Sequence, residues 1–129
     1  MAAPYTLKQL TDVKDSAPDF GLGEFQEARF AKDAVETEDT GFTYLRIQPD
    51  ARPPFGHVHE NAEEVYVVIA GSGRAKLDDE IVDLARLDAL RVAPKVKRAF
   101  EAGPEGLELL AFGPRHDGDG EVLENWWTD

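Results

Sequence analysis

The chain has 129 residues, a length that suits one domain with a single core. Its 26 acidic and 14 basic side chains give a formal net charge of −12, and such a surface repels phosphate backbones, so neither nucleic acid nor an anionic membrane is an expected partner. The chain has no cysteine, which excludes disulfides, thiolate metal ligands and a thiol nucleophile.

Residues 1–23 follow no regular pattern and are expected to form an N-terminal arm that lies on the domain or on a neighbouring subunit. They do not show a basic region followed by an apolar run, the pattern of a signal peptide. Nowhere in the sequence is there the stretch of roughly 20 apolar residues that a membrane helix needs. With the lack of disulfides, these features favour a cytoplasmic location.

The segment 24–113 is predicted to form the body of the domain from short strands. Residues 24–31 alternate only roughly, so a strand is expected there and a helix is the alternative, whereas the acidic segment 32–41 is expected to be a loop. Residues 42–48 alternate clearly and end before a proline-rich loop over 49–56. Further strands are expected at 64–70, 74–77, 80–84, 87–92, 98–102 and 107–112, with turns at 71–73, 78–79 and 103–106. This pattern predicts an all-β sandwich or barrel.

A cluster of possible metal ligands lies between two of these strands. His57 and His59 are two residues apart, so their side chains point the same way in an extended segment. Adding Glu64 gives two nitrogens and one carboxylate, the set that non-haem iron proteins use, and Mn, Ni, Zn and Co also accept these ligands. Glu63 competes with Glu64 for the carboxylate role, since only one of them can face the His pair if the strand includes both.

This stretch resembles the first motif of the cupins, Gly-x5-His-x-His-x3or4-Glu-x6-Gly. His57, His59, Glu64 and Gly71 match the motif at the required spacings, and Ala51 stands where its first Gly is expected. The resemblance covers about residues 40–112. It implies a single-domain antiparallel β-barrel of the jelly-roll, or double-stranded β-helix, type with a ligand cavity inside, and it implies a homodimer.

The second cupin motif, Gly-x5-Pro-x-Gly-x2-His-x3-Asn, aligns loosely with residues 87–103. Pro94 fits the motif, but Val96 and Gly103 stand where the motif has its second Gly and its Asn. The metal-binding His of the motif falls on Ala99, which cannot bind a metal, so the resemblance implies three ligands in place of four. Glu101 shares a strand face with Ala99 and either replaces the lost ligand or is solvated at the mouth of the barrel.

Two more side chains are candidates for a ligand pocket. Arg46 shares a strand face with Phe42 and Tyr44. If that face points inward, Arg46 and the nearby tyrosines make a corner that binds a carboxylate, and if it points outward, Arg46 is a surface charge. Tyr66 shares the face of Glu64, where its hydroxyl either donates a hydrogen bond to a ligand or is satisfied within the core.

The segment 114–129 is predicted to be a C-terminal tail that packs on the barrel or on a dimer partner. Trp126 and Trp127 stand near its end, and each can bury a large apolar area. They are expected to cap the open end of the barrel or to pack across a subunit interface, and contact with a ligand is the third alternative.

Two functions agree with these features. The prediction is a cupin-domain protein that binds a small molecule in its barrel, with an optional or incomplete site for Fe, Mn, Ni or Zn, or with no metal at all. Ala99 favours this function. The alternative is a metal-dependent enzyme, an oxygenase or isomerase, that uses His57, His59 and Glu64, and the intact first motif favours it. The sequence identifies no catalytic residue and no nucleophile elbow.

Overall fold

Antiparallel strands make up most of the computed structural model, which describes residues 4–115 and 118–128. The strands are β1 (Gln26–Phe30), β2 (Thr40–Ile47), β3 (Phe55–His59), β4 (Glu64–Leu77), β5 (Glu80–Leu84), β6 (Ala89–Val92), β7 (Arg98–Pro114) and β8 (Gly120–Glu124). The helices are short, η1 (Leu10–Asp12) and η2 (Ala17–Phe20) being 3-10 and α1 (Lys32–Val35) being α. Within the described ranges, no helix has the length and apolar character needed to cross a bilayer.

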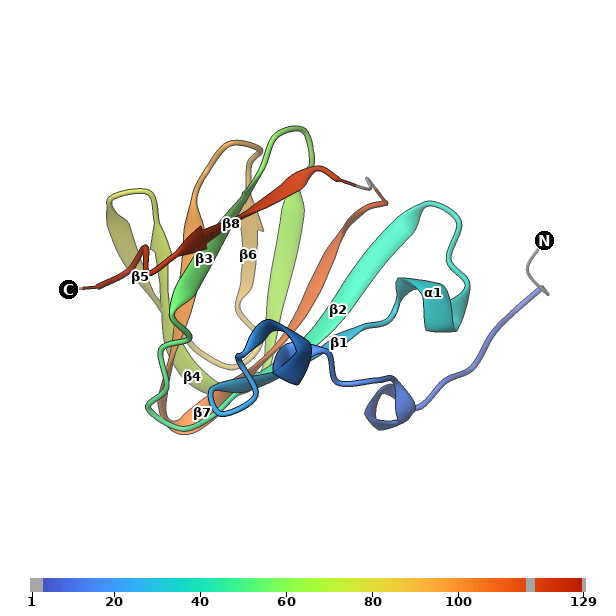
Figure 1. Ribbon diagram of the computed structural model, residues 1–129, viewed down its shortest axis with the longest axis horizontal. Helices are drawn as coiled ribbons and strands as arrows, with labels where there is room; N and C mark the ends of the chain where they lie inside the picture. Colours follow the sequence, from blue (N-terminus) through green and yellow to red (C-terminus); the bar gives the residue numbers. More distant parts are fainter. Residues whose placement is uncertain (1–3, 116–117, 129) are drawn as a thin grey trace.

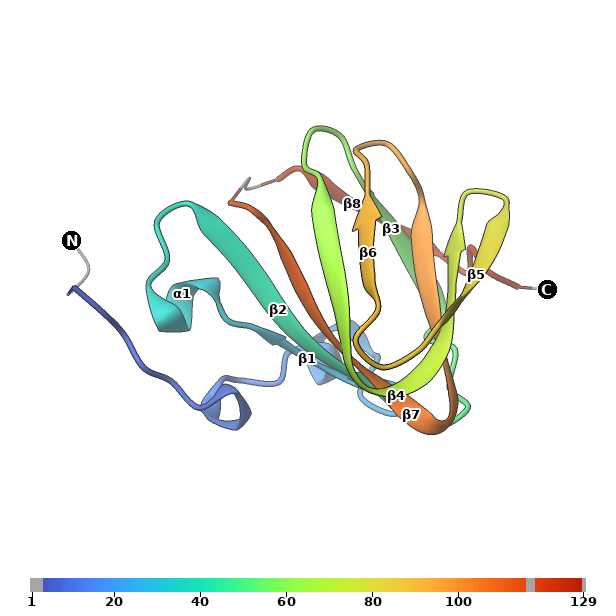
Figure 2. The ribbon, with the colours of Figure 1, turned by 180° about the vertical axis from the view of Figure 1, so that it is seen from behind.

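The strands form an 8-stranded sheet that curls into a half-barrel (Figures 1 and 2). Neighbours follow the order β1-β2-β7-β3-β8, and β4 pairs with β5, β6 and β7. The C-terminal half of β7 pairs with β2, whereas Arg98 at its N-terminal end pairs with His57 of β3. β7 therefore belongs to two walls of the half-barrel, and the predicted all-β barrel class is confirmed.

The two longest strands bend where the sequence predicts turns. β4 runs through residues 71–73 and β7 through 103–106, and the ladder between them continues on both sides, with Ser72 lying opposite the whole of 103–106. Gly71 and Gly106 have φ angles of +75° and +83°, which favour glycine. These glycines bend the paired strands without ending the ladder, so the predicted turns are wrong.

Three elements differ from the sequence prediction in other ways. β3 begins inside the predicted loop over 49–56, and β8 lies in the predicted tail. These two strands pair with each other, for example at His57↔Val122, and neither shows the regular apolar alternation that identifies a strand. The short helix α1 lies within 32–41, where a loop is predicted.

The N-terminal arm is attached to β1 through a carboxylate. Asp15 Oδ1 accepts hydrogen bonds from the backbone N–H groups of Ala17, at 3.0 Å, and of Ala28 in β1, at 2.9 Å. The N–H of Ser16 also donates to the carbonyl of Ala28 at 2.8 Å. This part of the arm therefore lies against the edge of the sheet.

The core lies on the inner face of the half-barrel. Alternation along β2 places Leu45 and Ile47 inside, next to Leu107 and Leu109 of β7. The buried core residues are Ile47, Tyr66, Val68, Ala75, Leu84, Val92, Phe100, Ala102, Leu107, Leu109 and Ala111. At the open end of this interior, β3 and the start of β4 carry the candidate ligands.

The bend in β4 provides a test of the fold. Gly71→Ala is expected to lower the free energy of unfolding by about 3 kcal/mol or more, because the left-handed φ is strained for alanine and the new Cβ would lie 2.0 Å from the carbonyl oxygen of Gly106. Urea unfolding followed by circular dichroism measures the loss.

Gly21→Ala is the matched control. Gly21 has a φ of +74°, but no atom beyond its two chain neighbours lies within 4 Å of the position that an added methyl group would take. Only the backbone strain of about 1–2 kcal/mol is therefore expected. Equal losses for the two variants would contradict the close approach of β4 and β7 at Gly71.

Candidate functional site

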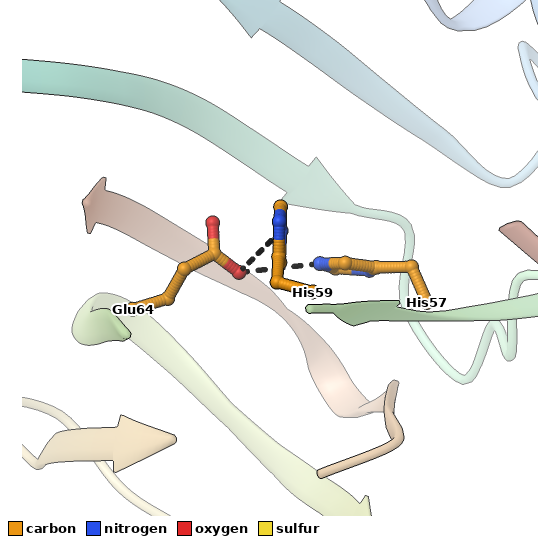
Figure 3. A group of neighbouring side chains, drawn as sticks. All are labelled: His57, His59 and Glu64. Carbon is orange, nitrogen blue, oxygen red and sulfur yellow. Dashed lines mark hydrogen bonds and ion pairs between the residues drawn. The ribbon is translucent and has the colours of Figure 1, made fainter. Parts of the chain in front are cut away.

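Three side chains from two strands converge at the open end of the interior. Figure 3 shows His57 and His59 of β3 facing one oxygen of Glu64, the first residue of β4. Glu64 Oε1 lies 3.2 Å from His57 Nε2 and 3.3 Å from His59 Nε2. The spacing of two along β3 therefore places both imidazoles on one face, as the sequence predicts.

The structure also distinguishes the two neighbouring glutamates. Glu64 points into the half-barrel, whereas Glu63 is exposed and pairs with Arg91 at 3.3 Å. Because successive residues in a strand face opposite ways, the two carboxylates cannot share the site.

Two further groups contact the same oxygen of Glu64. The Tyr66 hydroxyl donates to Glu64 Oε1 at 2.5 Å, and the guanidinium Nη1 of Arg98 donates to it at 2.9 Å. Arg98 Nη2 donates to the carbonyl of Ala93 at 3.2 Å. Both Tyr66 and Arg98 are buried, and Arg98 is 0% exposed. The hydroxyl of Tyr66 is thus satisfied within the protein.

The electrostatics of this cluster set the charge of each member. Burial opposes ionisation of Glu64, but hydrogen bonds from His57, His59 and Tyr66 outweigh it and hold the pKa of the Glu64 carboxyl well below its usual range. Burial lowers the pKa of His57, whereas the hydrogen bond to Glu64 raises the pKa of His59. Glu64 is therefore an anion at neutral pH, and the two imidazoles differ in their affinity for a proton.

A carboxylate on the far side of His59 completes the cluster. Asp119 Oδ2 lies 3.4 Å from His59 Nδ1, but the two atoms do not form a hydrogen bond. The Asp119 carboxylate accepts hydrogen bonds from the backbone N–H groups of Asn61 and Ala62, which fix its position. His59 is thus placed between two carboxylates.

The three first-motif residues have the donor atoms and spacing that a metal site requires. His57, His59 and Glu64 could hold a metal ion, since their ligand atoms lie within 4.8 Å of one another. An ion with bonds of about 2.1 Å holds neighbouring donors roughly 3.0–3.4 Å apart, and both imidazole nitrogens already lie at such distances from Glu64 Oε1. Imidazole nitrogens and a carboxylate suit Fe, Mn, Ni or Zn.

A pocket of about 390 Å³ opens beside this cluster. His59 and Glu64 line it, but His57, Tyr66 and Arg98 do not. The other lining residues come from β1, α1, β2, β7 and the segments next to them, and they are Phe30, Lys32, Gly41, Phe42, Thr43, Ala62, Ala111, Gly113, Pro114 and Arg115. The pocket therefore joins the inner face of β2 to the Glu64 end of the cluster.

The ligand position predicted at Ala99 is wrong by one residue. Arg98 pairs with His57 in the ladder and shares its face, so the side chain of Ala99 points to the opposite face. There Ala99 lies near the position that a side chain on Gly56 would occupy. The strand from which the second motif predicts a ligand therefore directs Arg98 at the His pair.

Glu101 also lies away from the cluster. Its carboxylate accepts hydrogen bonds from Arg52 Nε at 2.8 Å and from Arg74 Nη2 at 2.6 Å. These two guanidiniums neutralise it, and both lie near the ring of Trp127, with the Arg52 carbon 4.3 Å from the centroid. Glu101 thus neither replaces a metal ligand nor lines the pocket.

Arg46 has the outward orientation of the two that the sequence leaves open. Thr43, Leu45 and Ile47 occupy the inner face of β2, which leaves Arg46 on the outer face. Its guanidinium lies 3.6 Å from Glu27 and its side chain is 57% exposed. The carboxylate-binding corner with the tyrosines does not form.

The twin tryptophans pack on their own barrel. Trp127 is buried beneath Arg52 and Arg74, and the ring of Trp126 lies 4.8 Å from Lys76 Nζ. An added side chain on Gly56 would meet the Trp126 ring at 2.9 Å. The tail therefore covers the outside of β3 and the N-terminal end of β7, and neither ring lines the 390 Å³ pocket.

Sequence reasoning missed two residues of the cluster, Arg98 and Asp119. The pairing of Arg98 with His57 depends on a register that no motif states, although Arg98 stands directly beside the predicted ligand position. Asp119 precedes β8, and its place beside His59 depends on the pairing of β3 with β8. An acidic residue in a Gly-Asp-Gly segment carries no signal of that pairing.

No protein-family model matches the chain. A search of known sequences finds MJ1618, an uncharacterised protein of Methanocaldococcus jannaschii, which is 31% identical over 71 residues. The match covers 53% of this chain and 57% of that protein, so it spans less than two thirds of the relative's length.

Solved structures establish the fold. The chain is similar to a cupin protein of Bacteroides fragilis, with a TM-score of 0.71, 20% identity, and coverage of 98% of this chain and 94% of the other. A Klebsiella pneumoniae protein with a double-stranded β-helix domain gives a TM-score of 0.71 at 16% identity, with coverage of 92% and 96%. The polyketide cyclase RemF of Streptomyces resistomycificus gives a TM-score of 0.74 at 18% identity, with coverage of 100% of this chain and 89% of the other. The predicted cupin-like single domain is confirmed.

The unequal surroundings of the two imidazoles give a testable pH dependence. We expect His59 to titrate above, and His57 below, the ordinary pKa of about 6.5, because Glu64 stabilises the His59 cation and burial opposes the His57 cation. As pH falls below about 6.5, His57 therefore lowers the free energy of unfolding, since the unfolded chain binds the proton more readily. The stabilisation from His59 is complete below about 6.5 and is lost as pH rises through its raised pKa. NMR titration of the ring protons measures both values, and His57→Gln and His59→Gln assign the signals.

Glu64→Gln serves as the control for the cause of this difference. Removing the negative charge is expected to lower the pKa of His59 toward the ordinary value. Identical titration of the two rings in the unmodified protein would contradict the described geometry.

Proposed function

We propose that this small cupin-fold protein binds a small organic molecule in the pocket beside Glu64, and that His57, His59 and Glu64 form an optional or incomplete site for a divalent metal. The observation that supports it most is the pocket of about 390 Å³ that opens on His59 and Glu64. This volume lies within the range of about 300–1,000 Å³ that small-molecule sites occupy.

The chemistry of the pocket lining favours a molecule with an apolar body and one polar end. Phe30 and Ala111 offer apolar surface, and Thr43 adds a hydroxyl on the inner face of β2. His59 and Glu64 offer hydrogen-bonding groups where the pocket meets the cluster. A ring or short chain would pack on the apolar wall while a donor or acceptor reaches these two residues.

Ligand screening with a pocket variant tests this proposal. We expect compounds from a panel of small aromatic acids, nucleosides and cyclic ketones to raise the melting temperature of the unmodified protein. Thr43→Phe fills part of the pocket and is expected to weaken binding of the same compounds at least about tenfold, measured by isothermal titration calorimetry.

Arg46→Phe is the matched control, because it places the same ring on the outer face of the same strand. It is expected to leave the affinity unchanged. Equal affinity of Thr43→Phe and the unmodified protein, or a panel without any binder, would count against the pocket.

The second candidate is a metal-dependent oxygenase or isomerase. The observation that favours it is the spacing of the three donors, and a bound metal would supply a Lewis acid or a redox centre. About one equivalent of Fe, Mn, Ni or Zn in protein purified without chelator would support this candidate. The double variant His57→Ala, His59→Ala would then lose the metal and keep its fold.

We also propose that the chain forms a homodimer and works in the cytoplasm. The outer face of the half-barrel supports the dimer, since it carries a row of apolar side chains from three neighbouring strands: Phe42, Leu110, Phe112, Val65 and Val67. Phe42 and Phe112 stack there with ring centroids 6.0 Å apart. A second copy packed on this face would remove the row from water.

Light scattering tests the dimer. Phe112→Arg places a charge in the middle of the row and is expected to halve the molar mass in solution. Ile81→Arg, on an exposed side chain of β5, is the control and is expected to leave the mass unchanged. A Phe112→Arg protein that stays dimeric would exclude this face as the interface.

A further inference from the structure

We propose that Arg98 is the resident cation of this site and that its pairing with Glu64 keeps a divalent metal from binding at His57, His59 and Glu64. The inference concerns the metal part of the proposed function and rests on the alternative in which the metal site is incomplete. It does not depend on the organic ligand, so a failed ligand screen would leave it intact.

The first support is the fixed position of the guanidinium. Arg98 is completely buried, and its two terminal nitrogens donate to Glu64 Oε1 at 2.9 Å and to the Ala93 carbonyl at 3.2 Å. An arginine guanidinium stays protonated in proteins. A positive charge therefore remains beside Glu64 at any physiological pH.

The second support is competition for one oxygen atom. Glu64 Oε1 is the oxygen that faces both imidazole nitrogens, so a shared ion would bind there. Arg98 and Tyr66 already donate to this atom, at 2.9 Å and 2.5 Å. Two hydrogen-bond donors and two imidazole nitrogens therefore already surround this oxygen within 3.3 Å. A metal that binds this atom would compete with both donors for its lone pairs.

The third support is the charge balance of the interior. Glu64 and Arg98 form a neutral pair. A divalent ion bound by the same carboxylate would add two positive charges close to the buried guanidinium, and Asp119 beside His59 would offset one of them. Like charges repel strongly in such poorly solvated surroundings. The resident guanidinium therefore supplies the positive charge that an ion would otherwise provide.

The fourth support is the direction from which Arg98 enters. It stands opposite His57 in the ladder between β3 and β7, while Glu64 pairs with Val92 of β6. The guanidinium thus reaches Glu64 across the interior and not along one pair of strands. The second motif places the fourth metal ligand on β7. In this protein, β7 instead carries a cationic side chain that contacts the site.

Metal titration of the unmodified protein and of Arg98→Met tests the proposal. Calorimetry with Mn²⁺, Ni²⁺ and Zn²⁺ is expected to show no binding tighter than about millimolar in the unmodified protein, and elemental analysis after dialysis is expected to show less than about one tenth of an equivalent. Arg98→Met removes the charge and keeps a long apolar side chain. We expect this variant to bind one equivalent of at least one of these ions, with an affinity at least about tenfold higher than that of the unmodified protein.

Two further variants make the result specific. Arg98→Lys keeps the positive charge and is expected to bind metal as weakly as the unmodified protein. His57→Ala and His59→Ala, added to Arg98→Met, are expected to abolish the gain. A folded Arg98→Met protein with no gain in affinity would overturn the proposal.

The unmodified protein decides the case if Arg98→Met does not fold. One equivalent of metal that survives dialysis, or binding at micromolar affinity, would overturn the proposal, and the absence of binding would support it. Neither readout uses the small-molecule panel, so failure of this proposal and failure of ligand binding can be told apart.

Discussion

One carboxylate oxygen, Glu64 Oε1, holds together the end of the half-barrel where the pocket opens. It accepts hydrogen bonds from Tyr66 on its own strand and from Arg98 on β7, and it lies beside both imidazoles of β3. Strands that belong to different walls therefore meet at one atom. Removing one partner of such a buried pair typically costs about 3–5 kcal/mol, because the remaining charge stays without compensation. The charge pair is thus a constraint on both the fold and the chemistry of the site.

The bends at Gly71 and Gly106 make this meeting of the strands geometrically feasible. They allow β7 to pair with β2 over one half and to reach β3 with the other. Successive side chains in the N-terminal half of β7 point to opposite faces of the sheet, so that Arg98 and Phe100 face the interior. Glu101 faces the opposite side, where it meets Arg52 and Arg74. A shift of one residue in this register would exchange the two sets and place a carboxylate, not a guanidinium, on the inner face.

The sequence predicts those features that depend on local spacing and on the motif. His57 and His59 share a face because they are two residues apart, and the match that includes Glu64 and Gly71 predicts the fold correctly. Features that depend on long-range register could not be predicted. Arg98 contacts Glu64 only because β7 pairs with β3, and the loosely matching second motif places the ligand on the neighbouring residue.

The same distinction explains the elements that were missed. β3 and β8 are stabilised by each other, and their sequences contain glycine, histidine and acidic residues in place of an apolar alternation. Gly71 resembles a turn residue because a positive φ suits both a turn and a bulge, and the sequence does not distinguish the two. The sequence allows Arg46 to point inward or outward. Leu45 and Ile47 pack on the inner face of β2, and Arg46 therefore points outward.

Only part of the cluster lines the pocket, and this division bears on what the protein recognises. His59 and Glu64 line the pocket, whereas His57, Tyr66 and Arg98 do not. The motif residues that line the pocket are therefore only a small part of the surface that a ligand would meet. Most of that surface comes from β1, β2, the segment around α1 and the end of β7, which lie outside both motifs. Matching the motif consequently predicts the fold and the position of the site, while the choice of ligand depends on side chains such as Phe30 and Thr43 that no motif specifies.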